Sequence, residues 1–211
     1  MTEFVLKAFE TLCPDLDGIY ASAHAKPLNE WTRGQKALVT ASGAGAGAVP
    51  GLHLVGMAAD VPFLMNRMSV CSYGIGAIVG AEAGLGNVLE AEDFVVVLAV
   101  WADEGGVGDA IHSVTAARNP ESVTGGKVLG KSVYRILART TCERAGLLTD
   151  GKLSTALANK VAGRFAAKLG GKAAAGFLPL VGSIVGGGVN LWFLTGIATA
   201  AEQWFRFKVK G

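Results

Sequence analysis

The sequence is poor in charge, and this shortage excludes several classes of protein. Only 17% of the residues are charged, against about 25% in an ordinary soluble domain. Hydrophobic residues make up 51% of the chain, which excludes an intrinsically disordered protein. The composition therefore indicates a chain that buries an unusual share of its surface or contacts lipid.

Cysteine and histidine are also scarce, and neither forms a pattern that carries chemistry. Cys13, Cys71 and Cys142 lie far apart and include no Cys-x-x-Cys pair, which is typical of free thiols in a reducing compartment. The histidines have no second metal ligand at a suitable spacing. No Gly-x-Ser-x-Gly nucleophile motif is present. We therefore expect a protein that is not an enzyme and that uses no cofactor and no metal.

A secretory signal is missing from the first 18 residues. Acidic residues stand where a signal peptide would carry basic ones, and no long apolar run follows them. The segment predicts a short amphipathic helix instead. We expect a protein of the cytoplasm or of the inner face of the cytoplasmic membrane, although delivery by a dedicated secretion system would leave no such mark.

Helical periodicity and turn signals predict one all-α domain over residues 1–211, a compact helical bundle. Residues 1–30 are expected to form an N-terminal helical extension with breaks at Pro14 and Pro27. Residues 105–126, rich in Gly, Ser, Thr and Asn, are expected to form the main loop region.

A charge-free segment covers residues 37–59, which contain no Asp, Glu, Lys or Arg. Pro50–Gly51 interrupts it, so we expect two helices that meet at a turn. A further helix is expected to have Asp60 near its start and Pro62 in its first turn, where proline is tolerated.

Residues 91–104 have the strongest strand propensity of the chain. Glu92 and Asp93 also suit the N-terminus of a helix, and the helix is preferred. We interpret these acids, and the pair Asp103 and Glu104 at the other end, as solvated ends of an apolar segment.

A second charge-free segment covers residues 173–201. It is long enough to span a bilayer, which takes about 20 apolar residues. Pro179, the glycines at 186–188 and Asn190 argue against a spanning helix. We expect a buried helix, a glycine turn and a second helix that starts at Val189.

Charge is distributed unevenly along the chain. Residues 1–121 hold 6 basic and 14 acidic residues, whereas residues 122–211 hold 13 basic and 3 acidic ones. Either the acidic and the basic half of the chain pair electrostatically, or the second half faces an anionic partner. Two basic quartets at four-residue spacing predict basic faces on two amphipathic helices. They comprise Lys127, Lys131, Arg135 and Arg139 and, further on, Lys160, Arg164, Lys168 and Lys172, with Arg206, Lys208 and Lys210 forming a basic tail.

Glycines also recur at four-residue spacing, which on a helix makes a groove that a neighbouring backbone can enter. We interpret these glycines as sites of close helix packing in a compact core, with helix association inside a membrane as the alternative. They are Gly43, Gly47, Gly51, Gly76, Gly80, Gly84, Gly182 and Gly186.

Residues 125–132 match the P-loop pattern G-x-x-x-x-G-K-[ST]. A P-loop follows an apolar strand, however, and the preceding residues HSVTAARNPES do not predict one. Nucleotide binding therefore remains the least favoured alternative. Only Tyr134 and Phe165 lie among the basic quartets, so we expect no nucleic-acid partner.

Three short stretches resemble the EcsC family. They are Pro50–Gly51, Asp60–Val61–Pro62 and the segment from Pro179 through Asn190. The resemblance covers residues 42–104 and, more loosely, 127–208. It implies an all-helical protein connected with membranes, in a family named after a protein linked to an ABC exporter, and it implies no catalytic residues.

These observations favour a non-enzymatic protein that binds or inserts into membranes through its basic helices and its glycine-rich apolar helices. The expected partners are anionic membrane lipids, with a membrane transporter or an immunity protein as further candidates. Two alternatives remain open: a pore-forming effector exported without a signal peptide, and a soluble module that binds a lipid or another apolar ligand.

Overall fold

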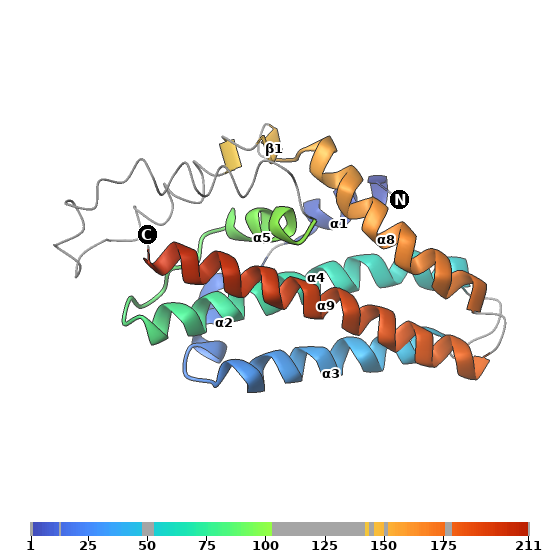
Figure 1. Cartoon of the computed structure of the whole chain (residues 1–211), viewed down its shortest axis with the longest axis horizontal. Coiled ribbons are helices and arrows are strands. Elements are labelled where there is room, and N and C mark those ends of the chain that lie inside the picture. The colour runs from blue at the N-terminus through green and yellow to red at the C-terminus, as the bar shows by residue number, and fades with distance from the viewer. Residues whose placement is uncertain are drawn as a thin grey trace.

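The protein is a helical bundle, shown in Figure 1 as a computed structural model. The structure describes residues 2–12, 14–47, 53–102, 142–143, 146–149, 152–153, 154–175 and 179–210. The all-α class is confirmed, because helices and one short hairpin account for the secondary structure of these residues. The elements are α1 (Thr2–Glu10), α2 (Leu16–Ala23), α3 (Leu28–Gly47), α4 (His53–Glu82), α5 (Asp93–Ala102), β1 (Leu148–Thr149), β2 (Lys152–Leu153), α8 (Thr155–Ala175) and α9 (Pro179–Lys210).

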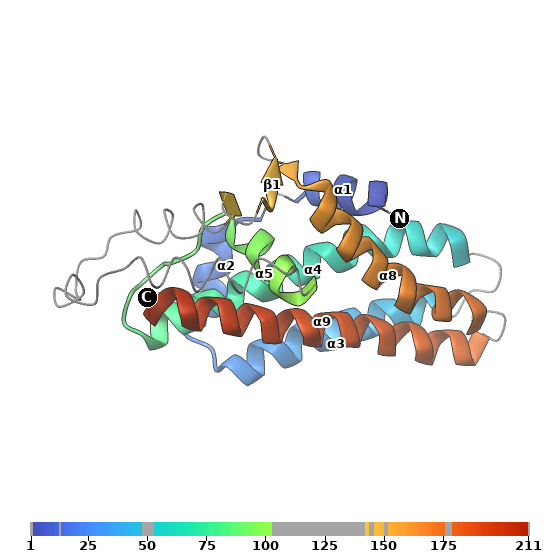
Figure 2. The same ribbon diagram turned by 45° about the horizontal axis from the view of Figure 1, so that its top comes forward.

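Three long helices, α3, α4 and α9, form the body of the bundle. They lie side by side, with α3 antiparallel to both α4 and α9 (Figures 1 and 2). The short helix α5 packs on α9 and α8, while α1 contacts α4 and α8 and α2 contacts α4. The antiparallel pair β1–β2, with Leu148 opposite Leu153, leads into α8.

The N-terminal breaks lie where proline places them. Between α1 and α2 the chain passes Pro14, and Asp15 then caps α2 by accepting a hydrogen bond from the backbone N–H of Gly18 at 2.9 Å. Pro27 directly precedes α3. Both predicted breaks are confirmed, whereas the predicted loop region at residues 105–126 lies outside the described residues.

Helix α3 packs through one face with a period of about four residues. Trp31, Gln35 and Val39 are buried on it, as one stripe of an amphipathic helix requires. The Trp31 indole N–H donates to the carbonyl of Cys71 on α4 at 3.3 Å. Its ring lies against Gly74, where any side chain would collide with it.

Helix α5 confirms the preference for helix over strand at residues 93–102, while residues 103 and 104 of the predicted segment lie outside the described residues. All of its residues except Val100 are buried, so it is covered on nearly every side rather than along one stripe. The bulky run of valines suits such a core position, because branched side chains fill the space between α4, α8 and α9.

Two predicted helix boundaries are wrong. Helix α4 starts at His53 rather than near Asp60, so that Pro62 lies inside a 30-residue helix. Helix α9 runs through the glycines at 186–188 for 32 residues without the expected turn. An interior proline costs about 3 kcal/mol and an interior glycine about 1 kcal/mol, and we infer that packing along the long helices outweighs both penalties.

The glycines on α4 lie at close contacts. A side-chain carbon added at Gly76 would lie 2.5 Å from the ring of Phe205 on α9, and one at Gly80 would lie 2.9 Å from Val88. Gly84 differs, because it follows the helix in a turn and has a positive φ of 71°. It serves the left-handed turn after α4 and not a helix contact.

The contacts of the other predicted glycines lie outside the part of the molecule that the structure describes. Four of these glycines belong to α3 and α9, and the fifth is itself outside the described residues. They are Gly43, Gly47, Gly182, Gly186 and Gly51.

We expect Gly76→Ala to lower the free energy of unfolding by about 1–3 kcal/mol, because the new methyl group overpacks the contact with Phe205. Gly163→Ala on α8 is the matched control, since nothing lies within 4 Å of an added carbon there. It should raise the stability by about 0.5–1 kcal/mol by removing a helix-interior glycine. Urea denaturation measures both, and equal effects of the two substitutions would contradict the packing described for α4 and α9.

Candidate functional site: the uncharged end of the bundle

The two charge-free segments of the sequence come together at one end of the molecule. The last part of α3, residues 37–47, and the first part of α4 lie there beside the end of α8 and the start of α9 (right-hand end of Figures 1 and 2). Residues 173–201 contribute the α8 and α9 parts. We call this the uncharged end. The name refers to residues 37–59 and 173–201, which contain no Asp, Glu, Lys or Arg, whereas Lys168 and Lys172 precede the second segment on α8.

Large apolar side chains are exposed in or next to the same segments. Leu38 on α3 is 50% exposed, and Leu191 and Trp192 on α9 are 37% and 41% exposed. Phe63, which follows the first charge-free segment on α4, is 37% exposed. Within the described part of the chain, these are the large hydrophobic residues that remain exposed. These side chains belong to α3, α4 and α9, the three helices that form the body of the bundle.

An aromatic cluster joins α5, α8 and α9 beside Trp192. The rings of Phe165 and Phe193 stack with centroids 4.4 Å apart, and Trp101 lies 5.7 Å from Phe193. Trp192 meets Trp101 edge to face at 6.3 Å. Gly196 lets the Trp101 indole approach α9, because an added carbon would lie 2.5 Å from its ring nitrogen. Trp192 is thus held by buried aromatic rings while it stays exposed itself.

Cationic side chains lie on the same helices as the charge-free segments, outside these segments. The guanidinium of Arg164 on α8 lies 5.3 Å from the centre of the Trp101 ring, and that of Arg67 on α4 lies 5.9 Å from the Phe63 ring. On α3, Lys36 directly precedes the charge-free segment. We call Arg67, Arg164 and Lys36 the cationic collar. Asp60 is an acidic exception in the sequence near this end.

Arg67 has an unused hydrogen-bond donor. Its Nη2 donates to Asn66 at 3.0 Å, but its buried Nε has no hydrogen-bond partner among the described residues. A guanidinium with an open donor suits a phosphate or carboxylate oxygen, which it binds through a charge-assisted hydrogen bond.

The structure describes only part of the predicted basic faces. Helix α8 carries the second quartet, with Lys160 exposed and Arg164 half-buried over the aromatic cluster. Lys168 and Lys172 lie further along α8 towards the uncharged end, and their side chains are outside the described residues. The same holds for the whole of the first quartet and the P-loop pattern at 125–132, which includes Lys127, Lys131, Arg135 and Arg139.

At the opposite end of α9, Lys208 and Asp93 form a buried ion pair, and two interpretations of the sequence are wrong there. Both side chains are fully buried, so Lys208 is not part of a solvated tail and Asp93 is not a solvated helix end. Lys208 Nζ donates to both carboxylate oxygens of Asp93 and to the carbonyl of Val88, each at 2.8 Å. The sequence misleads here because burial pairs residues that lie 115 positions apart.

The Asp93 carboxylate accepts further hydrogen bonds from Trp204 Nε1 at 2.9 Å and from the backbone N–H of Glu90 at 2.8 Å. Burial raises the pKa of Asp93, and the Lys208 ammonium opposes this rise. With its oxygens occupied by four hydrogen bonds, this carboxylate is placed to hold helices together and not to act on a ligand.

The described cysteines are inert. Cys71 and Cys142 are free and buried, as expected of free thiols, and burial raises the pKa of each to about 12. Both therefore remain protonated near neutral pH, where a reactive cysteine would be a thiolate.

Comparisons with known proteins leave the family open: no family model, no curated protein and no solved structure matches the chain. The resemblance to the EcsC family thus stays a prediction. Among the helices of the described residues, none has both the length and the apolarity needed to cross a bilayer.

We expect Lys208→Met to lower the free energy of unfolding by about 3–5 kcal/mol, because it leaves the Asp93 charge buried without its partner. Combining it with Asp93→Asn should recover most of this loss, since the neutral amide still accepts from Trp204. Thermal and urea unfolding measure the stability of the wild type, the two single variants and the double variant.

Lys210→Met is the control for this cycle, because Lys210 lies exposed two residues further on. It should leave stability unchanged. If the effects of Asp93→Asn and Lys208→Met were simply additive, the pair would not be the energetic unit described here.

Proposed function

We propose that the protein is a non-enzymatic peripheral membrane protein that docks its uncharged end into an anionic bilayer. The observation that carries the proposal is that the two charge-free segments come together in the fold and that the exposed Leu38, Leu191 and Trp192 all belong to these segments. Lipid acyl chains would remove these side chains from water without demanding any polar partner from them.

The dimensions suit insertion into one face of the bilayer. Residues 37–47 of α3 rise about 16 Å at ~1.5 Å per residue. A protein that lies in the interface buries its apolar surface about 5–10 Å deep, whereas the hydrocarbon core is about 30 Å thick. The uncharged end is therefore long enough to enter one leaflet, and the proposal requires no spanning helix.

Aromatic and cationic residues stand where headgroups would meet the protein. Tryptophan favours the membrane–water interface, and Trp192 is the exposed member of the aromatic cluster. Each Lys or Arg near an anionic surface contributes about 1 kcal/mol. Arg67 and Arg164 are only partly buried, so their guanidinium groups contribute charge at this surface.

Neither the exposed apolar side chains nor the cationic collar contributes a large binding free energy by itself. Full burial of one large apolar side chain contributes about 1.5–3 kcal/mol, and the exposed residues here are already more than half buried or nearly so. The cationic collar adds a term of similar size that salt weakens. Stable membrane attachment generally takes two such signals together, so both substitutions tested below should weaken binding.

We expect Leu191→Ser combined with Trp192→Ser to weaken binding to vesicles of phosphatidylserine and phosphatidylcholine at least tenfold, because it removes the exposed apolar side chains of α9. Gln203→Ser, at an exposed position further along the same helix, is the control and should bind like the wild type. Co-sedimentation measures binding, and circular dichroism checks that the helices persist.

The contribution of the cationic collar to membrane binding is tested with a second set of variants. Arg67→Gln combined with Arg164→Gln should weaken binding and reduce its dependence on salt, whereas Arg33→Gln at an exposed position of α3 before the charge-free segment should not. Absence of wild-type binding, or equal binding by all variants, would refute the proposed docking.

A further inference from the structure

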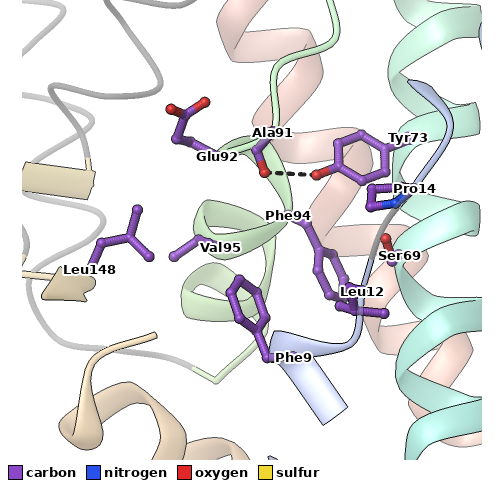
Figure 3. A pocket seen from close by; sticks show the side chains of 10 residues that line it. All are labelled: Phe9, Leu12, Pro14, Ser69, Tyr73, Ala91, Glu92, Phe94, Val95 and Leu148. Atoms are coloured by element: carbon purple, nitrogen blue, oxygen red, sulfur yellow. Dashed lines mark hydrogen bonds between the residues drawn. The ribbon is translucent and has the colours of Figure 1, made fainter. Parts of the chain in front are cut away.

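A pocket of about 280 Å³ lies away from the uncharged end, between α1, α4, the start of α5 and β1. Figure 3 shows side chains from these elements converging on it. Its lining is mostly apolar and includes three aromatic rings. The lining residues are Phe9, Leu12, Pro14, Ser69, Tyr73, Ala91, Glu92, Phe94, Val95 and Leu148.

Ser69 gives this pocket a polar atom without a partner. Its side chain is 1% exposed, and its Oγ makes no hydrogen bond to any residue that the structure describes. A helical serine usually donates to the carbonyl four residues earlier, as Ser72 does to Met68 at 2.8 Å. Leaving a buried hydroxyl unpaired costs about 1–3 kcal/mol. The hydroxyl of Ser69 is thus a buried group that a ligand in the pocket would satisfy.

The other polar groups restrict the charge of that ligand. The Tyr73 hydroxyl donates to the carbonyl of Ala91 at 2.8 Å, so it is engaged at the rim (Figure 3). Glu92 is the charged residue among the described lining residues, and no basic residue accompanies it there. The Glu92 carboxylate points away from the aromatic rings in Figure 3, and an anionic ligand would be removed from water without a compensating cation.

The aromatic side chains favour a ring as the apolar part of the ligand. Phe9 and Phe94 are nearly parallel, with centroids 6.5 Å apart and 7° between their planes, and Tyr73 lies 6.4 Å from Phe94. Such rings pack on another ring in offset or edge-to-face geometry. A cavity of about 150 Å³ holds benzene, so the pocket has room for a substituted single ring.

We propose that this pocket binds a small neutral aromatic molecule with one hydroxyl group, a substituted phenol, whose hydroxyl bonds to Ser69 Oγ. The ring packs against Phe9 and Phe94, and Leu148 of β1 closes one side. This site is independent of the membrane-docking end, because none of its lining residues belongs to the charge-free segments or the cationic collar.

The test compares three probes of one shape on the full chain by isothermal titration calorimetry: 4-methylphenol, toluene and 4-methylbenzoate. The wild type should bind 4-methylphenol about threefold to tenfold more tightly than toluene, which reflects one additional hydrogen bond. The benzoate, which meets no basic residue among the described lining residues, should bind more weakly than either.

Ser69→Ala should abolish the preference for 4-methylphenol and leave toluene binding unchanged. This variant should fold at least as well as the wild type, because it removes an unpaired buried group from a helix. Ser72→Ala is the matched control: Ser72 is buried on the same helix, bonds to Met68 and does not line the pocket. It should retain the preference.

Leu148→Trp fills the pocket from β1 and should abolish binding of both neutral probes, independently of Ser69. The proposal is overturned if the wild type binds no probe saturably or prefers toluene. It is equally overturned if Ser69→Ala keeps the preference or if Leu148→Trp leaves binding intact.

Discussion

The ion pair between Asp93 and Lys208 is the interaction on which the arrangement of the helices depends. Two charges removed from water on elements 115 positions apart in the sequence stay paired only if α9 keeps its register against the start of α5. The bond from Lys208 to the carbonyl of Val88 adds the α4–α5 connection to the same point. Because α9 is one continuous helix of 32 residues, fixing its last turns also fixes its first turns beside α3 and α4.

The molecule is thereby divided into two ends with different chemistry. One end is held by buried polar contacts, and the pocket beside Ser69 lies on that side of α4. Both charge-free segments meet towards the other end, and the exposed Trp192 belongs to the second of them. The proposed ligand pocket and the proposed docking surface therefore use different residues of one helical bundle.

Sequence patterns predicted what depends on neighbours along the chain. The helical class, the breaks at Pro14 and Pro27 and the helical state of residues 93–102 follow from local signals. Pro62 and the glycines at 186–188 led to wrong helix boundaries, because tertiary packing outweighs the free energy that these residues cost inside a helix. The pairing of Asp93 with Lys208, and the meeting of two distant charge-free segments, depend on the fold and leave no local signal. Arg164 was predicted as a basic contact, but its position over Trp101 depends on the packing of α8 against α5.

The most direct test of the membrane-docking account is the depth of Trp192 in the bilayer. The other tryptophans, Trp31, Trp101 and Trp204, are buried. The signal of Trp192 is therefore taken as the difference between the wild type and Trp192→Phe, which leaves the buried tryptophans in place. With vesicles of anionic lipids brominated along the acyl chain, the account predicts a blue shift and quenching that is strongest for bromines near the headgroup. Emission that remains that of a water-exposed indole, unquenched at every depth while the protein stays folded, would contradict it.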